Sequence, residues 1–178
     1  VLSNILCVTK DKGAFNVAHQ VVPELRQRGH NVSVIAEGLS AALWKKQGEA
    51  LAFEGSVDFT KEPYEINVEE WLDRLAPQVV VATGSVPINL ERRFAGAATH
   101  FGIPVVSLED AIGATKRIGI VPSTILTLNQ LALDFYQGQE VMPGTRKVAV
   151  GSDYFKPLGL NDLKQAEVAE MRKKYDTL

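Results

Sequence analysis

Short apolar runs rich in β-branched residues alternate with amphipathic stretches along the whole chain. Continuous apolar runs of this length are typical of strands buried on both faces, whereas apolar positions three or four apart predict helices. The runs predict strands at 4–9, 31–36, 50–53, 78–82, 104–108, 124–128 and 147–150. The amphipathic stretches predict helices at 14–25, 39–48, 68–75, 86–101 and 130–136, with a loop and a short helix in 109–121.

Successive strand–helix units with apolar strands predict a parallel sheet covered by helices on both faces. We therefore expect an α/β fold, a Rossmann-like three-layer αβα domain over residues 1–150 with a mostly parallel sheet of about seven strands. Residues 151–160 are typical of a crossover linker, and 161–175 predict a further helix. The chain begins at Val1 and ends at Leu178 within that helix, so residues 151–178 are interpreted as the start of a second domain; trimming of a tag or tail is the alternative.

Two of the predicted helices contain residues that bear on where they begin and which face they bury. Pro23 lies inside the first helical stripe and should kink that helix or delay its start. In the helix predicted at 86–101, the apolar stripe runs from Val86 through Phe94 to Phe101, and Ser85 suits its N-cap. Glu91 and the two arginines after it fall opposite this stripe, which predicts a solvated cluster.

Composition narrows the possible functions. The 178 residues are 46% hydrophobic and 22% charged, which is ordinary for a globular domain. The net charge is −2 and no dense basic run occurs, which argues against a nucleic-acid partner. No apolar window approaches the length of a membrane span. Cys7 is the single cysteine, so no intrachain disulfide can form, and a reducing, cytoplasmic compartment is the expectation.

Ligands of open α/β sheets bind outside the carboxyl ends of the strands. That rule selects the segments 9–13, 83–86, 109–116 and 128–130. Helix N-termini begin at these segments, and their unpaired N–H groups favour phosphate or carboxylate.

The first segment has the richest chemistry. Lys10 and Lys12 are candidates to bind an anion, Gly13 allows close backbone approach, and Asp11 is the candidate catalytic base. A solvated polar loop is the alternative, with about even weight. Neither the glycine spacing of dinucleotide folds nor that of phosphate-binding loops is present, which lowers the weight of an NAD dehydrogenase or a P-loop NTPase.

The other segments add candidate substrate-binding residues. Thr83, Gly84 and Ser85 form a strand-to-helix turn with two hydroxyls, suited to an anion or a sugar hydroxyl. Asp110 follows the strand at 104–108. Asn129 is either a ligand contact or, with about twice the weight, the N-cap of its helix.

Other chemistry-bearing residues give weaker signals. His19, His30 and His100 form no metal-ligand pattern, and no metal site is expected. Cys7 lies inside a strand and is interpreted as core. Trp44 and Trp71 are expected to pack.

Several segments, taken in order and spacing, resemble the N-terminal, acceptor-side domain of GT-B glycosyltransferases. The similarity covers about 155 residues and lies in Arg28-Gly29-His30-Asn31-Val32 and in segments 77–108, 124–129 and 147–155. Each motif is weak alone; the order carries the resemblance. The segment 147–155 lacks the central Asn or Pro of the family pattern.

The resemblance implies sugar transfer from a nucleotide-sugar donor to an unidentified acceptor, a sugar or a lipid-linked one with peripheral membrane contact. The donor would bind mostly to a C-terminal half, so this chain alone would bind no cofactor and would be inactive. The family's histidine after the first strand is missing, and Asp11 would take its place as base. Two alternatives remain open: a sugar-nucleotide 2-epimerase of the same architecture, and a non-catalytic Rossmann-like binding module.

Overall fold

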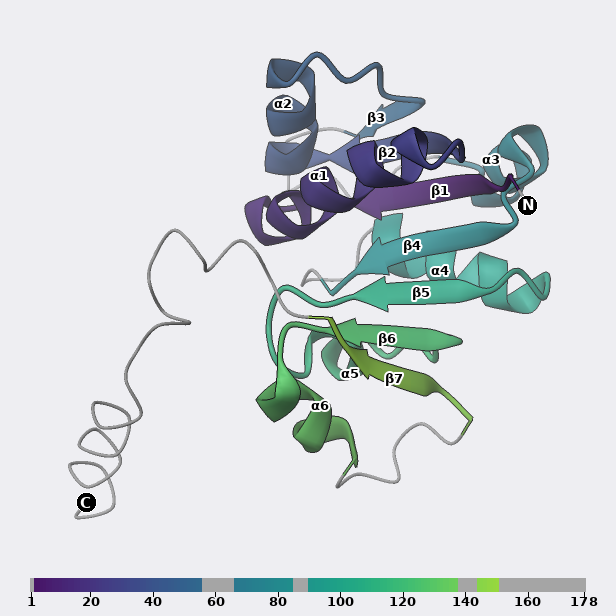
Figure 1. The fold of residues 1–178 in the computed structure, drawn as a ribbon. Coiled ribbons are helices and arrows are strands. Elements are labelled where there is room, and N and C mark those ends of the chain that lie inside the picture. The colour runs from purple at the N-terminus through teal and green to yellow at the C-terminus, as the bar shows by residue number, and fades with distance from the viewer. Residues whose placement is uncertain (1, 56–65, 85–89, 138–143, 151–178) are drawn as a thin grey trace.

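All seven strands form a single parallel sheet in a computed structural model of the chain, which describes residues 2–55, 66–84, 90–137 and 144–150 (Figure 1). The strands are β1 Asn4–Thr9, β2 Asn31–Glu37, β3 Phe53–Gly55, β4 Val79–Thr83, β5 Val105–Leu108, β6 Thr124–Thr127 and β7 Arg146–Ala149. Their order in the sheet is β3-β2-β1-β4-β5-β6-β7. The α/β, Rossmann-like prediction of about seven strands is therefore confirmed.

Helices connect the strands. They are α1 Lys12–Gln27, α2 Gly38–Lys46, α3 Val68–Leu75, α4 Leu90–His100, α5 Ala114–Ile118 and α6 Gln130–Gln137. In Figure 1, α1 and α2 lie in front of the sheet and α4 lies behind it. Every helix in the described ranges is too short or too polar to cross a membrane.

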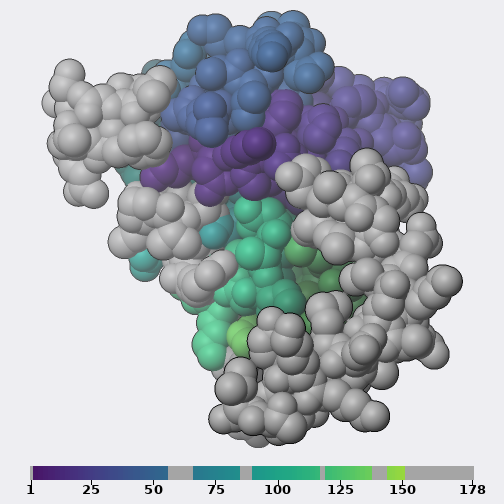
Figure 2. All heavy atoms as spheres, turned by 90° about the vertical axis from the view of Figure 1, so that its left-hand side faces the viewer, coloured from purple at the N-terminus to yellow at the C-terminus, as the bar shows by residue number. Residues whose placement is uncertain are grey.

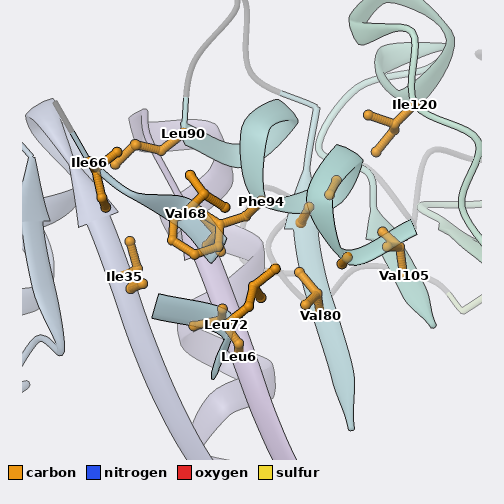
Figure 3. Packing of buried hydrophobic residues seen from close by; sticks show 14 residues of the cluster. Leu6, Ile35, Ile66, Val68, Leu72, Val80, Leu90, Phe94, Val105 and Ile120 are labelled. Carbon is orange, nitrogen blue, oxygen red and sulfur yellow. The ribbon is translucent and has the colours of Figure 1, made fainter. Parts of the chain in front are cut away.

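The two faces of the sheet bury separate apolar clusters. Alternate residues of one strand point to opposite faces, so Cys7 packs under α1 and α2 while Leu6 packs under α3 and α4. Figure 3 shows the cluster under α3 and α4, in which the side chains of Phe94, Val68 and Leu72 lie over the strands. These clusters give the three layers of the fold.

The strand order reverses between β1 and β4. From β1 the chain steps outward to β2 and β3, then returns to β4 on the other side of β1 and continues to β7. All strands point the same way, so their carboxyl ends meet at one edge, on the left in Figure 1. We call this the carboxyl edge and the opposite one the amino edge. Ligands of such sheets bind at the carboxyl edge, near the reversal.

Three expectations differ from the structure. The third strand begins at Phe53 rather than at residue 50, because it pairs only with the end of β2. The helix α1 starts at Lys12, so a delayed start was wrong; Pro23 lies inside it and is exposed. Phe101 is 51% exposed because α4 ends at His100, one residue before it.

Residues 151–178 and Ser85 lie outside the described residues, so the second-domain interpretation and the N-cap of Ser85 stay predictions.

Candidate functional site

Buried polar side chains gather at the carboxyl edge. Among the described residues, every buried polar or charged side chain lies near the carboxyl end of a strand or in the first described turn of a helix. The set is Thr9, Lys10, Glu37, Ser40, Thr83, Glu91, Ser107, Glu109, Thr115 and Thr127. Burying polar groups costs free energy unless they are paired, so their confinement to one edge marks that edge as the candidate site.

Lys10, the residue after β1, is buried, which contradicts a solvated loop at this position. Its Nζ lies 4.0 Å from Oε1 of Glu37, the last residue of β2. The same oxygen accepts a hydrogen bond from the backbone N–H of Leu90 at 3.3 Å. An acidic side chain at the end of the second strand binds ribose in dinucleotide folds. Here Glu37 instead ties β2 to the first loop and to α4.

Asp11 is the N-cap of α1. Its backbone is extended and its Oδ1 accepts a hydrogen bond from the N–H of Ala14 at 2.8 Å. Lys12, the first residue of α1, is exposed at the same helix end. The structure therefore gives Asp11 a capping role, and its role as a base stays a prediction.

Gly13 and Gly84 are places where neighbouring loops touch. A Cβ on Gly13 would lie 1.9 Å from Oδ2 of Asp110, so the loops after β1 and β5 meet there. A Cβ on Gly84 would lie 2.3 Å from the Cβ of Ala114, at the start of α5. Figure 2 views this edge directly, with the purple residues of the first strand–helix unit against the green residues of the second half. Packing between loops thus explains both glycines without a ligand.

Glu91 is fully buried, so the expectation of a solvated cluster was wrong for this residue. Its Oε1 accepts a hydrogen bond from the hydroxyl of Thr83, the last residue of β4. The side chain therefore points from α4 toward the carboxyl edge. The partner of this carboxylate lies on β4, and helical periodicity does not contain a contact with a strand.

Thr9, the last residue of β1, is also buried and hydrogen-bonded through its side chain. Its Oγ1 lies 2.7 Å from Oγ of Ser40 and accepts a hydrogen bond from Nε1 of Trp44 at 3.0 Å. The expectation that Trp44 packs is confirmed, since it is 3% exposed.

Glu109, directly after β5, is the centre of a buried polar cluster. Its Oε1 accepts hydrogen bonds from the backbone N–H of Thr115, at 3.0 Å, and from the hydroxyl of Tyr136. The Thr115 hydroxyl pairs with that of Ser107. Burial, and then the hydrogen bond to Glu109, raise the pKa of the Tyr136 hydroxyl, so Tyr136 stays protonated and donates the hydrogen bond to Glu109.

The second carboxylate oxygen of Glu109 has no partner. Oε2 is the single buried side-chain nitrogen or oxygen without a hydrogen bond in the described part of the chain. The sequence rule that selected 109–116 covered Glu109, yet it nominated the neighbouring Asp110. A carboxylate placed immediately after a buried strand was the signal that could have found it.

Asn129 is the N-cap of α6, as the favoured alternative predicted. Its Oδ1 accepts a hydrogen bond from the N–H of Ala132 at 2.9 Å. The interpretation of Cys7 as core is also confirmed, since it is 2% exposed. Burial raises the pKa of its thiol to about 12, which makes it a poor nucleophile.

The histidines do not form a site. His19 stacks on Phe15 within α1, and His100 contacts Phe101 at the end of α4. Within the described ranges no three of His, Cys, Asp and Glu come together in a way that could hold a metal ion.

No protein-family model and no curated protein sequence matches the chain. Solved structures do match its fold. S. aureus MnaA, in a co-structure with UDP, has a TM-score of 0.67 at 13% identity, over 92% of this chain and 48% of that one. A UDP-N-acetylglucosamine 2-epimerase from Rickettsia bellii has a TM-score of 0.64 at 16% identity, over 92% and 49%. A putative enzyme of that name from Listeria monocytogenes has 0.64 at 10%, over 89% and 47%.

The chain thus spans about half the length of the structures it matches. These similarities show the fold, a GT-B-like domain. The part of the family resemblance that concerns architecture is confirmed by them; sugar transfer is not.

Proposed function

We propose that this chain forms one half of a sugar-nucleotide 2-epimerase-like enzyme. The observation that carries the proposal is the fold: about nine-tenths of the chain superposes on roughly half of several UDP-N-acetylglucosamine 2-epimerases. The carboxyl edge, where the buried polar residues gather, would then face the sugar.

The chemistry of the edge supports this assignment. Inverting carbon 2 of a nucleotide sugar by proton transfer requires a group that removes the proton while the bond from carbon 1 to UDP breaks, which leaves a double bond between carbons 1 and 2. A second group returns a proton to the other face as the bond to UDP forms again, and carboxylates can do both. Three carboxylates of the described residues follow strands at this edge: Asp11 after β1, and Glu109 and Asp110 after β5. Glu109 is the stronger candidate, because its Oε2 lacks a protein partner whereas Asp11 caps α1.

The nucleotide would be bound by polar groups near the strand reversal. Lys12 is exposed at the N-terminus of α1, where a phosphate is favoured. Lys10, two residues before Lys12, is buried beside Glu37, so its charge is opposed by that carboxylate. We expect most nucleotide contacts to come from a second half, and weak binding of UDP by this chain alone.

Glycosyl transfer from a nucleotide sugar is the second candidate, favoured by the order of motifs in the sequence. It also needs a base, to deprotonate an acceptor hydroxyl. The acceptor would be a sugar or a lipid-linked molecule, with peripheral membrane contact in the second case.

The two reactions differ in what happens at one carbon. The protein encoded by the complete reading frame that contains this chain is incubated with UDP-N-acetylglucosamine in deuterium oxide. Proton NMR then follows the signal of the hydrogen at carbon 2. An epimerase replaces the hydrogen at carbon 2 with deuterium and forms the 2-epimer. A transferase leaves that hydrogen in place and releases UDP when an acceptor is added.

The control variants are Glu109→Gln and Asp11→Asn, which remove each charge at nearly constant volume. Loss of exchange in Glu109→Gln with retention in Asp11→Asn is the expected result. Absence of both exchange and UDP release in the unmodified protein would leave the non-catalytic binding module as the function.

A further inference from the structure

We propose that Tyr136 is a positioning residue: its hydroxyl holds one oxygen of Glu109 so that the other oxygen is left for a ligand. The proposal deepens the assigned function, since it rests on Glu109 being the group that meets the sugar. Tyr136 does not itself touch the reacting atoms in this scheme.

The first step is the asymmetry of the carboxylate. Oε1 of Glu109 accepts two hydrogen bonds, from Tyr136 and from the backbone N–H of Thr115. Oε2 accepts none, although a carboxylate oxygen can accept two. Buried carboxylates are ordinarily satisfied on both oxygens. The unmatched acceptor is therefore suited to a donor that arrives with the ligand, such as a sugar hydroxyl.

The second step is that the two donors come from different elements. Thr115 belongs to α5, a helix of five residues bounded by Gly113 and Gly119, both in the left-handed region. Tyr136 belongs to α6, and its buried ring packs on Ile125 of β6. Two different elements therefore fix the same oxygen.

The third step concerns access. Oε2 is covered in the structure, so a ligand reaches it only after its surroundings shift. The Tyr136 hydroxyl also interacts with the Thr115 side chain and the Lys116 backbone, and a Cβ on Gly113 would lie 3.0 Å from the Phe135 ring, so α5 and α6 pack against each other. The ring of Tyr136 is held on the sheet by Ile125. Tyr136 is thus the side chain that ties Glu109 and α5 to the sheet and keeps the carboxylate oriented.

The test compares three variants of the complete protein. Tyr136→Phe keeps the ring and removes only the hydroxyl. Thr145→Val is the matched control, because it removes a part-buried hydroxyl that donates to the carbonyl oxygen of Pro122 at 2.7 Å, outside the Glu109 cluster. Glu109→Gln removes the charge that is being positioned.

We expect Tyr136→Phe to lower kcat for solvent exchange at carbon 2 by about tenfold, the equivalent of one hydrogen bond to a charged group, with KM within about twofold. Thr145→Val should keep kcat within about twofold at a similar loss of thermal stability. A purely structural role of Tyr136 would instead lower stability in both variants and leave kcat alike. Equal kcat in Tyr136→Phe and Thr145→Val would overturn the proposal.

A second measurement needs no turnover. With carbon-13 in the glutamate carboxyls of the chain, the Glu109 signal is followed as N-acetylglucosamine is added, in the unmodified chain and in Tyr136→Phe. We expect the sugar to move this signal in the unmodified chain and to move it several-fold less at the same concentration in the variant.

The two measurements separate the two proposals. A protein without exchange or transfer, whose Glu109 signal still responds to sugar through Tyr136, would refute the enzymatic function and keep the positioning role. A Glu109 signal that ignores the sugar in the unmodified chain, or responds equally in both, would refute the positioning role.

Discussion

The two edges of the sheet differ in how their polar groups are paired: in contact with solvent at the amino edge, and buried at the carboxyl edge. At each edge the strands end, and loops must cover the interior. The amino edge uses exposed amide pairs: Asn4 accepts from Asn31 and donates its backbone N–H to Gln78, and all three groups remain in contact with solvent. The carboxyl edge uses buried carboxylates and hydroxyls, such as Glu91 with Thr83 and Glu109 with Tyr136.

The amino edge also carries a groove, and it is of a different kind. The groove has a volume of about 270 Å³ and is lined by Glu69, Leu72, Asp73, Ala76, Phe101 and Ile103. Its floor is apolar and its acidic groups sit on the outer turns of α3. None of the buried polar residues in the described ranges lines it. The amino edge shows that a sheet of this kind can be closed without burying charge, and the buried charge of the carboxyl edge is what the proposed ligand site would account for.

The largest effect should come from the interior between the edges. Phe94→Ala removes a fully buried ring from the centre of the cluster in Figure 3, and should cost about 3–5 kcal/mol of unfolding free energy. Phe101→Ala is the matched control at the amino edge, in the residue after the same helix; because it is half exposed, it should cost at most about 1 kcal/mol. Urea unfolding monitored by circular dichroism gives both values. Similar losses would mean that the amino edge is as tightly packed as the core.

The next effect tests whether the carboxyl-edge glycines serve packing. Gly84→Ala should cost about 2–3 kcal/mol, because the new Cβ would lie 2.9 Å from the backbone carbonyl carbon of Ala114, which cannot rotate away.

Gly13→Ala meets instead the end of the Asp110 side chain and should cost about 1 kcal/mol. In the background of Asp110→Ala, which removes the obstructing carboxylate, Gly13→Ala should cost nearly nothing more, so the double variant should be about as stable as Asp110→Ala alone. Unfolding of the four variants checks the ranking, and a Gly84 variant as stable as the parent would return that glycine to a ligand role.

A smaller loss should follow at the buried hydroxyls. Thr83→Val keeps the shape of the side chain and leaves Oε1 of Glu91 without its hydroxyl donor, at a cost of about 1–2 kcal/mol. Thr83→Ser retains the hydroxyl and should cost less. If the valine variant is the more stable of the two, the pair contributes nothing to stability and the case for a functional origin becomes stronger.

The smallest effect has the opposite sign. Gly96 is exposed on α4, away from both edges, and a Cβ there would meet no atom within 4 Å. Gly96→Ala should stabilise the protein by about 0.5–1 kcal/mol, since alanine loses less backbone entropy in a helix. A rise in the thermal midpoint would show that the costs at Gly84 and Gly13 come from contacts and not from the loss of glycine as such.

Local sequence was sufficient to predict features that depend only on residues close together in the chain. The helix at 68–75 was predicted with its observed ends, because the acidic first turn and the apolar positions lie within eight residues. Asn129 was assigned as an N-cap for the same reason, since the amide it satisfies is three residues away. The expectation that Phe101 belongs to the buried apolar stripe was wrong, because the exposure of this side chain depends on where α4 ends.

The sequence by itself determined the layers of this protein: strands buried on both faces, helices between them, and hence a parallel sheet with a carboxyl edge where loops carry polar residues. The alternation of apolar and polar positions is enough for that, because burial and periodicity are local properties of the chain. Only the tertiary structure decided which of those polar residues are buried and with whom. Glu109 meets Tyr136, and Asp110 meets Gly13, across sequence distances that no periodic pattern records. The order of the strands brings them together, and that order is fixed by the packing of the whole sheet.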